Sequence, residues 1–567
     1  MCRRPVTATD SLSANLHPVL SRIYRARAVT TPAELEHGLD KLLPPGRLLG
    51  MERAVTLLAE ALRAHKRILV VADFDADGAT SCALVVRALR AMGAADVRYV
   101  VPNRFEYGYG LTPEIVALAA KQQPDLIITV DNGIASVDGV EAAHARGMQV
   151  LITDHHLPGA SLPAAEAIVN PNQPGDDFPS KALAGVGVAF YVMLALRAYL
   201  RENSGFAQQG IPEPNLAQFL DLVALGTVAD VVPLDHNNRI LVAQGLARLN
   251  ADQGCAGIRA LLAVAGRASR RLTASDLGFC VAPRLNAAGR LEDMSLGIEC
   301  LLTDDDHAAL AMAQRLDTLN RERRAIESDM QQQALTAVRS LHLDEAGLPR
   351  GLCLYDESWH QGVIGLVASR IKERVHRPVI AFAPANDREL KGSARSVPGL
   401  HIRDALDNIA ARDPALLSKF GGHAMAAGLT LARDRFEAFA RAFDEEAGRW
   451  LSEDDLRGRM YTDGELEAGD FSLELAEALR AAGPWGQGFP EPVFDGCFDI
   501  LDRRIVGEKH LKLTLRGGNM KPISAIAFNA AETPSDWTRV RAAYRLDVNE
   551  YQGNRSLQLV LEHLEPV

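Results

Sequence analysis

Cysteine, aromatic side chains and long apolar runs are all scarce in this chain of 567 residues. Its seven cysteines are odd in number and none are spaced as CxxC, which argues against a disulfide framework or a zinc ribbon and favours a reducing compartment. The longest uncharged stretch, 182–196, is shorter than the ~20 residues of a membrane-spanning helix. No apolar segment follows Arg3 and Arg4, so we expect no secretory signal and a soluble, cytoplasmic protein.

The chain also has no excess of positive charge. Its 61 lysines and arginines against 72 aspartates and glutamates give a net charge of −11. This balance excludes a wholly basic nucleic-acid coat, although it leaves room for a local basic channel. The hydrophobic content of 47% and the charged content of 23% are typical of folded globular chains, and the length favours several domains.

Short apolar runs alternate with helical stretches in the first half of the chain. Four such runs lie at 67–71, 97–101, 126–130 and 148–153. Strand–helix alternation of this kind predicts a parallel sheet in an α/β fold.

The rest of the chain divides into regions of different character. A long helical period is followed by a second α/β pattern, and then by apolar–polar alternation that is typical of a small β-barrel. We therefore expect five regions: a helical cap (1–50), an α/β domain with a helical extension (51–303), a bridging helix (304–345), a second α/β domain (346–453) and a small β-barrel (454–567).

Three of the predicted strands end in aspartates. They are followed by Asp73-Phe-Asp75-Ala-Asp77, by Asp131-Asn-Gly and by Asp154-His155-His156, and the carboxyl ends of parallel strands meet at one edge of a sheet. Ionised carboxylates gathered there need a counter-charge. Mixed carboxylate and imidazole donors suit Mn²⁺ or Mg²⁺, and two such ions are the usual device for attack of water on phosphorus. Taken singly, each turn is equally typical of ordinary loop chemistry.

Four segments resemble the motifs of the DHH phosphoesterase superfamily, namely 73–78 (DFDADG), 130–133 (VDNG), 154–156 (DHH) and 228–233 (VADVVP). Residues 421–428 (GGHAMAAG) resemble the glycine-rich motif of the DHH-associated substrate domain. Residues 283–290 (PRLNAAGR) and 359–365 (WHQGVIG), with the predicted C-terminal barrel, are similar to those of the bacterial RecJ family within this superfamily.

The resemblance implies that 51–303 holds the catalytic domain, that 346–453 binds substrate and that 454–567 is an oligonucleotide-binding (OB) type barrel for nucleic acid. It also implies a role for each matching residue. Two divalent cations, Mn²⁺ or Mg²⁺, would be held by Asp75, Asp77, Asp131, His155 and Asp230, with Asp73 in the same motif. Asp75, Asp77 and Asp131 would also count as catalytic, together with His156 at the scissile phosphate, while Asp154 would orient a histidine. The residues implied in phosphate or DNA contacts are Arg104, Arg284, Asn286, Arg290, Ser393, Arg395, Ser396 and His423.

The activity that the resemblance implies is a 5′→3′ exonuclease specific for single-stranded DNA. It would hydrolyse phosphodiesters with two metals, release 5′-mononucleotides and act in recombination, mismatch repair and base-excision repair. Single-strand-binding protein and a RecQ-type helicase would be partners of a monomeric enzyme. Two alternatives stay open: a DHH-type phosphodiesterase acting on short oligonucleotides or cyclic dinucleotides, and a non-catalytic DNA-binding scaffold.

Two positions depart from the family pattern, because Ala72 and Ala394 stand where glycine is usual. If position 394 required a positive φ, alanine there would displace Ser393 and Arg395. In the barrel region, five aromatic residues are candidates for stacking on bases, although a place in the core is the better interpretation for most of them: Trp485, Phe489, Phe494, Tyr544 and Tyr551.

Overall fold

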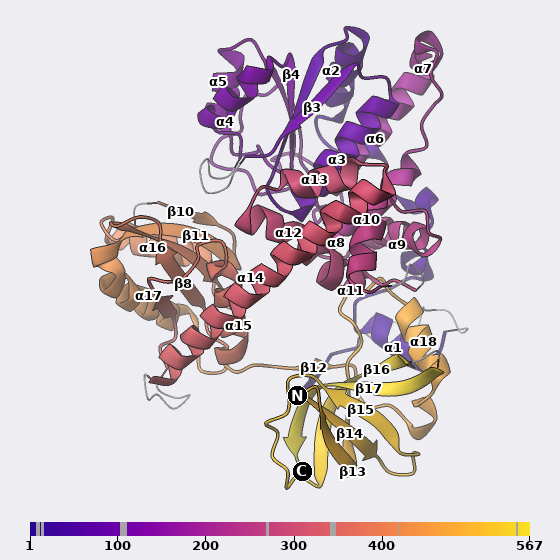
Figure 1. Ribbon diagram of the computed structural model, residues 1–567, viewed down its shortest axis with the longest axis vertical. Coiled ribbons are helices and arrows are strands. Elements are labelled where there is room, and N and C mark those ends of the chain that lie inside the picture. The colour runs from indigo at the N-terminus through magenta and orange to yellow at the C-terminus, as the bar shows by residue number, and fades with distance from the viewer. Residues whose placement is uncertain are drawn as a thin grey trace. The chain divides into compact units, whose positions relative to one another are not determined.

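The computed structural model describes residues 1–6, 12, 16–102, 110–267, 271–340, 348–417, 419–551 and 554–567, without the side chains of 337–340 and 551. The chain forms two compact units (Figure 1). The first contains 1–289, 293–317 and 460–567, and the second contains 290–292 and 318–459. No helix within the described ranges combines the length and the hydropathy needed to cross a membrane.

A parallel five-stranded sheet forms the centre of the first unit. Its order is β3-β2-β4-β5-β6, and every neighbouring pair is parallel, as the sequence predicts. The strands are β2 (Arg67–Ala72), β3 (Asp96–Val100), β4 (Leu126–Val130), β5 (Gln149–Thr153) and β6 (Ala167–Val169). The sequence pattern does not predict β6, because three residues are too few to show a period.

Helices cover both faces of this sheet, which explains why its strands are almost continuously apolar. α4 (Pro113–Ala119) and α5 (Val137–His144) pack on one face through Ile115 and Val140. α2 (Met51–Arg63), α3 (Ala76–Ala91) and α6 (Gly185–Glu202) pack against the remaining strand surface. Beyond them lies a helical extension that consists of α7 (Gly205–Gln209), α8 (Leu220–Ala229), α9 (His236–Asn250), α10 (Ala256–Val264), α11 (Ala274–Asp276), a π-helical turn (Leu277–Val281), α12 (Ala282–Leu291) and α13 (Ser295–Leu302).

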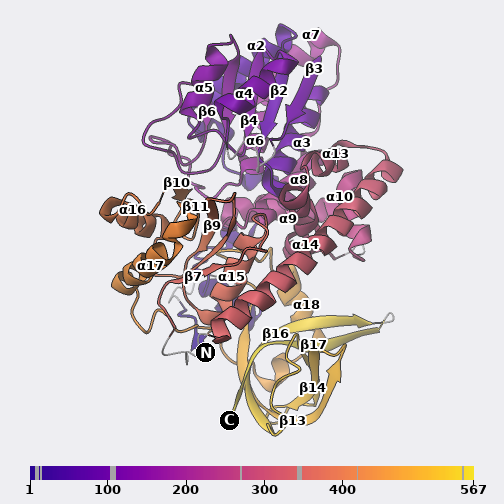
Figure 2. The same cartoon turned by 60° about the vertical axis from the view of Figure 1, so that its left-hand side comes forward.

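The C-terminal part of the first unit is a closed barrel in the order β13-β14-β15-β17-β16 (Figure 2). Its strands are β13 (Phe494–Val506), β14 (His510–Arg516), β15 (Ile523–Ala527), β16 (Arg539–Tyr551) and β17 (Asn554–Pro566), and α18 (Leu473–Ala481) precedes them. Every neighbouring pair is antiparallel except β15 and β17, which are parallel. This is the topology of an OB-type barrel, so the prediction of such a barrel is confirmed.

The N-terminal segment contacts the chain just before this barrel. β1 (Cys2–Arg3) pairs with β12 (Tyr461–Thr462), and α1 (Pro18–Arg25) brings Tyr24 onto the rings of Trp485 and Phe489 at centroid distances of 6.1 and 6.2 Å. The region expected to be a helical cap therefore also supplies a strand. The sequence does not predict this strand, because two residues carry no recognisable pattern.

The second unit is built on a mixed sheet in the order β10-β11-β9-β8-β7. Only β7 and β8 are parallel within it. Its elements are β7 (Leu352–Tyr355), α15 (Ile364–Val375), β8 (Val379–Pro384), β9 (Glu389–Arg395), α16 (Ile402–Arg412), β10 (Lys419–Gly422), β11 (Ala426–Ala432) and α17 (Phe436–Trp450). The long helix α14 (Asp306–Ser340) begins in the first unit and continues into the second, and residues 341–345 of the bridging helix expected over 304–345 lie outside the described residues.

Ala72 and Ala394 both occupy regular strand positions. Ala394 is fully buried in β9, pairs with Ile380 and Ala427, and is absent from the residues with a positive φ. Ala72 is buried at the end of β2 beside Val130. Neither alanine has a positive φ, so Ala394 gives no reason for Ser393 and Arg395 to be displaced.

Candidate metal centre

The loop after β2 carries three of the predicted acids and starts helix α3. Asp75 caps this helix, because its Oδ1 accepts hydrogen bonds from the backbone N–H groups of Asp77 (2.9 Å) and Gly78 (3.0 Å). Gly78 permits the tight turn, since a Cβ there would lie 2.4 Å from the carbonyl oxygen of Asp73. Helix capping therefore gathers Asp73, Asp75 and Asp77 at the carboxyl edge of the sheet.

Asp131 follows β4 and has a left-handed backbone, with φ at 61°. Its N–H donates to the carbonyl of Thr153 at 3.0 Å, which ties it to the neighbouring strand. Gly185 lies so close that a Cβ there would be 2.6 Å from the Cβ of Asp131. Such a conformation is strained for a non-glycine residue and persists only where the surroundings hold it. These contacts hold the buried carboxylate of Asp131 in place.

Asp154 organises the two histidines that follow β5. Its Oδ1 accepts hydrogen bonds from the backbone N–H of His155 (2.7 Å) and lies 2.8 Å from Nδ1 of His156, while its Oδ2 accepts from the N–H of Ile134 (2.9 Å). The ring that Asp154 orients is therefore that of His156. The resemblance did not specify which histidine this would be.

The ring of His155 lies next to three acids that come from different elements, namely the end of one strand and two helices. Its Nε2 lies 3.1 Å from Oδ1 of Asp131, 3.4 Å from Oδ2 of Asp230 and 3.9 Å from Oδ2 of Asp77. Asp230 reaches this point from the C-terminal end of α8. Asp77 is fixed by hydrogen bonds from the N–H groups of Gly185 (2.6 Å) and Val186 (3.0 Å) at the start of α6.

Ligand atoms of these residues form three overlapping sets, in each of which the atoms lie within 4.8 Å of one another. The sets are Asp77 with His155 and Asp230, Asp73 with Asp75 and Asp131, and Asp131 with His155 and His156. The structure thus brings together all six of the predicted metal ligands. Carboxylate oxygen and imidazole nitrogen without thiolate is a donor set that fits Mn²⁺ or Mg²⁺.

Burial and mutual repulsion oppose the ionisation of the carboxylates at this edge. Burial and the neighbouring charge of Asp75 raise the pKa of Asp77 to about 7. Burial also raises the pKa values of Asp131 and Asp230 well above the ordinary value, and the charges of Asp77 and Asp75 raise them further. A divalent cation would remove this penalty by supplying the missing positive charge.

The surroundings of His156 favour its charged form, whereas those of the carboxylates favour the neutral form. Burial lowers the pKa of its ring, but the hydrogen bond and the charge of Asp154 outweigh burial and raise the pKa to about 9. The pKa of Asp154 is lowered in turn, because its contacts with His156 outweigh its own burial. The ring of His156 is therefore protonated at neutral pH and carries two N–H donors.

Two asparagines that the sequence reasoning missed support the histidines. Asn172 donates from Nδ2 to the carbonyl of His155 at 2.6 Å, and Asn170 donates from Nδ2 to the carbonyl of His156 at 3.0 Å. Both follow β6, at the same edge where β2, β4 and β5 are followed by aspartate. The available signal was the polar pair of Asn170 and Asn172 directly after an apolar run.

Three predicted phosphate contacts of the first unit have different surroundings. Asn286 reaches the acid loop, because its Oδ1 accepts from the N–H of Ala76 at 2.9 Å. Arg284 is buried, and its guanidinium donates to Asp317 at 2.9 Å and to the carbonyl of Cys280. Arg104 lies outside the described residues.

The other predicted contacts belong to the second unit. Ser393 and Arg395 lie two residues apart on β9, and Nη1 of Arg395 donates to Oγ of Ser393 at 3.1 Å. Arg290 donates to the carbonyl of Gly362 at 3.3 Å. The loop of His423 joins β10 to β11, which pairs with β9. Ser396 is buried and donates instead to the carbonyl of Leu400 at 2.7 Å.

The barrel aromatics mostly serve the core. Phe494 and Tyr544 are fully buried, Trp485 and Phe489 stack on each other at a centroid distance of 5.1 Å, and the side chain of Tyr551 lies outside the described residues. Phe528, which the sequence analysis did not single out, is exposed and packs edge-on against His510 at a centroid distance of 5.2 Å.

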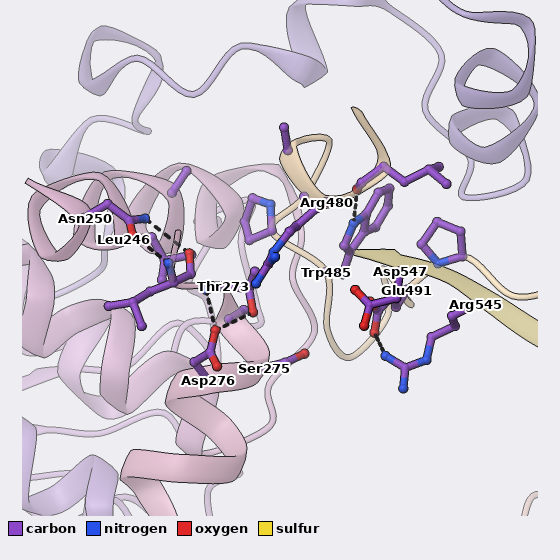
Figure 3. Close-up of a pocket in the computed structure, with 18 of the residues that line it drawn as sticks. Leu246, Asn250, Thr273, Ser275, Asp276, Arg480, Trp485, Glu491, Arg545 and Asp547 are labelled. Atoms are coloured by element: carbon purple, nitrogen blue, oxygen red, sulfur yellow. Dashed lines mark hydrogen bonds and ion pairs between the residues drawn. The ribbon is translucent and has the colours of Figure 1, made fainter. Parts of the chain in front are cut away.

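A cavity of about 490 Å³ lies between the helical extension and the barrel, away from the acids. Figure 3 shows Trp485 and Arg480 on its barrel side and Thr273 and Asp276 on its helical side. Several of its charged and polar groups are paired: Arg545 donates to Glu491 at 2.7 Å, and Asp276 accepts from Thr273 at 2.9 Å. We interpret this cavity as part of the joint between the two regions.

Three family models match the chain: the DHH family N-terminal domain over 67–227, the DHHA1 domain over 349–449 and the RecJ OB domain over 462–563. Curated relatives described as the single-stranded-DNA-specific exonuclease RecJ align over 100% of this chain and 99% of their own length. Their identities are 56% in Dickeya dadantii, 53% in Escherichia coli and 50% in Haemophilus influenzae. The chain belongs to the RecJ family.

Solved structures of this family agree with the fold. Thermus thermophilus RecJ in complex with Mn²⁺ is 32% identical and has a TM-score of 0.80, with 97% of this chain and 76% of that chain covered. The same protein in complex with Mg²⁺ has a TM-score of 0.75 at 31% identity, with 97% and 75% covered. The predicted choice of Mn²⁺ or Mg²⁺ therefore matches the ions of these relatives.

Proposed function

We propose that this RecJ-family chain is an exonuclease that degrades single-stranded DNA from its 5′ end and releases 5′-mononucleotides. The observation that carries the proposal is the convergence of six metal-ligand candidates at one sheet edge, where buried carboxylates have raised pKa values. Identities of 50–56% over the full length with single-stranded-DNA-specific exonucleases support the substrate.

Asp73, Asp75, Asp77, Asp131, His155 and Asp230 would hold two divalent cations in this proposal. Bound cations of this kind supply an activated water and neutralise the charge that develops on phosphorus. The protein contributes the fixed carboxylates, which its capping and backbone hydrogen bonds hold in place before substrate arrives.

His156 would act on the scissile phosphate. Asp154 holds Nδ1 of the ring at 2.8 Å, so the ring has Nε2 as its second donor. A protonated ring donates a charge-assisted hydrogen bond to a phosphate oxygen, which is stronger than a neutral one. In this proposal, Asp154 keeps the ring of His156 in a fixed orientation, and the ring stabilises the negative charge of the scissile phosphate.

We further propose that the remaining predicted phosphate-binding residues select the free 5′ end. Arg395 and Ser393 share one face of β9, where an arginine fork and a hydroxyl suit a terminal phosphate. Arg104, Arg290 and His423 would add contacts along the strand. For Arg284 and Ser396, which are buried, we propose a positioning role instead.

The biological setting is also a proposal. It includes a cytoplasmic monomer, action in recombination, mismatch and base-excision repair, and association with single-strand-binding protein and a RecQ-type helicase. Each of the five regions would have one role. These are a cap (1–50), catalysis (51–303), a bridge (304–345), substrate binding (346–453) and binding of the strand (454–567). The barrel favours a long polymer over cyclic dinucleotides, because OB barrels bind extended strands.

The test is nucleotide release from a single strand of 40 nucleotides that carries a label at its 5′ or its 3′ end. The reactions contain Mn²⁺, Mg²⁺ or EDTA, with a blunt duplex alongside. Asp131→Ala removes a central carboxylate, and Asp125→Ala is a matched control, because Asp125 precedes the opposite end of the same strand β4.

Immediate release of a labelled mononucleotide from the 5′ end, lost with EDTA, with duplex and in Asp131→Ala, is the expected result. Cleavage confined to fragments of two to five nucleotides would favour the short-oligonucleotide phosphodiesterase. Binding of the strand without metal-dependent cleavage would favour the scaffold.

A further inference from the structure

Two of the most exposed large apolar side chains in the described part of the chain lie on elements that pack beside the metal centre. Phe279 is 76% exposed and Val231 is 63% exposed, and the third, Val567, is the last residue. Val231 directly follows Asp230 at the end of α8. Phe279 lies on the π-helical turn 277–281, which packs against α8. An exposed apolar pair beside a site is more informative than the same residues scattered singly.

The backbone at both positions is unusual. Val231 has a φ of 59°, a left-handed conformation that a β-branched residue rarely adopts. Phe279 lies in a π-helical turn, a local feature that is common at functional sites. Leu277 and Val281 are fully buried on either side of it, so the turn is anchored while Phe279 points outward. The left-handed backbone of Val231 persists only where its surroundings hold it, and such positions cluster at functional sites.

The turn of Phe279 is tied closely to the acid cluster. Gly278 lies against α8, since a Cβ there would be 3.1 Å from Cγ1 of Val228. The helix continues as α12, where Asn286 accepts from the N–H of Ala76 in the acid loop at 2.9 Å. Seven residues of helix span about 10 Å, so Phe279 lies roughly two turns from this contact.

The chemistry of a single strand matches this placement. Unpaired bases expose flat apolar faces, and stacking on an aromatic side chain stabilises a bound base, whereas a duplex offers no such face. We propose that Phe279 stacks on a nucleobase of the strand whose phosphate lies at the metal centre, with Val231 packing beside that base or its sugar. Phe279 is then a substrate-contacting residue that helps to select single strands. The inference rests on the proposed exonuclease function.

The test is an abasic scan. Single strands carry one abasic nucleotide at each of the first ten positions from the 5′ end, and kcat/KM for release is compared between wild type and Phe279→Leu, which keeps the apolar bulk without the ring. Phe279→Tyr restores the ring. Phe528→Leu is the matched control, because it removes another exposed aromatic ring, on the barrel.

For wild type we expect a drop of roughly tenfold when the abasic nucleotide occupies one particular position, as expected for a lost stacking contact. Phe279→Leu should lose a similar factor on the intact strand and show no further drop at that position. Phe279→Tyr and Phe528→Leu should keep the wild-type profile near the 5′ end. Thermal unfolding of each variant shows whether it is folded, and the positional profile does not depend on the amount of folded enzyme.

An unchanged positional profile in Phe279→Leu would overturn the inference while leaving the exonuclease function intact. Failure of wild type to degrade any single strand with Mn²⁺ would instead overturn the proposed function itself. A fall in apparent mass on sedimentation of Phe279→Leu, with the scan unchanged, would assign the exposed ring to self-association and also overturn the inference.

Discussion

Two groups of buried aspartates in the same unit have opposite surroundings. At the metal centre, Asp77 and Asp131 face other carboxylates, and burial together with this repulsion raises their pKa values. Near the barrel, Asp495 accepts from Thr462 at 2.7 Å and from Arg3 and Arg541 at 3.1 and 3.2 Å. Burial raises the pKa of Asp495, but these hydrogen bonds outweigh it and lower the pKa.

The comparison teaches that burial of a carboxylate does not by itself mark a site. What distinguishes the two groups is the source of the positive charge. Asp495 and Asp463 receive it from arginines of the chain, and Arg27 binds Asp463 through two hydrogen bonds of 2.7 and 3.1 Å. The acids at the sheet edge face one another and the two histidines, so we infer that their charge is balanced by bound cations.

The largest effect is expected from Asp131→Asn. Activity should fall about a thousandfold, because the cations that this residue helps to hold supply several kcal/mol of charge stabilisation. The metal-free variant should unfold at a higher temperature than metal-free wild type, since one repelling carboxylate is gone, and Mn²⁺ should no longer raise its Tm.

Asp495→Asn is the control for this experiment. It should lower the Tm with or without Mn²⁺, because it weakens hydrogen bonds that the chain itself provides. Equal changes of Tm in the two variants would contradict the distinction between the two groups.

The next largest effect is expected from Arg27→Met. Removing this guanidinium leaves Asp463 buried without its main partner, which costs about 3–5 kcal/mol of unfolding free energy for a buried ion pair. Urea unfolding measures this loss. Arg27→Met combined with Asp463→Leu should regain most of it, because no uncompensated charge then remains. A double variant as unstable as the single one would show that packing on Trp485 matters more than the charge.

Much of the fold could be predicted from the sequence, because its strongest patterns are local. The four longer strands of the parallel sheet, the long helix and the alternation of the barrel each repeat a period over several residues. β1 and β6 are too short to show one. The acids at the strand ends could be predicted to converge, because parallel topology places them at one edge.

The supporting contacts of the site could not be predicted, because they depend on tertiary packing. The sequence does not tell that the carboxylate of Asp154 contacts the ring of His156 and not that of His155. It also does not tell that the guanidinium of Arg284 donates to Asp317. For Trp485 and Phe489 the core is the better interpretation, but the sequence does not tell that they pack against Tyr24 of the N-terminal helix. Phe279 and Phe528 gave no signal, since exposure is a property of the folded chain.

A smaller effect is expected from pH. In the metal-free protein, folded Asp77 keeps its proton up to about pH 7, whereas an unfolded aspartate loses it near 3.8. The folded state then binds more protons, so this group lowers stability as the pH rises between these values. Asp495 has a lowered pKa, so its contribution is present above pH 3.8 and is lost at lower pH.

The measurement is Tm from pH 5 to 8 in EDTA and in Mn²⁺, for wild type and Asp77→Asn. Tm of wild type in EDTA should decline with pH more steeply than that of the variant. Mn²⁺ should remove the wild-type decline, because bound cations favour the ionised carboxylates. The same slope in both proteins in EDTA would contradict the raised pKa of Asp77.

The smallest effect is expected from Ala394→Gly, which restores the residue usual in the family. Because Ala394 lies in a regular strand, glycine should cost about 0.5–1 kcal/mol of unfolding free energy and leave kcat unchanged. Urea unfolding and nucleotide release check the two parts. A clear gain in activity would mean that alanine displaces Ser393 or Arg395 after all.

The most direct test of the central claim is anomalous diffraction from crystals soaked in Mn²⁺. The account predicts two manganese peaks about 3.5–4 Å apart at the carboxyl edge of the sheet. One peak should lie among Asp77, His155 and Asp230 and the other among Asp73, Asp75 and Asp131. An edge without manganese, or peaks elsewhere in the chain, would contradict the assignment of these acids to a metal centre.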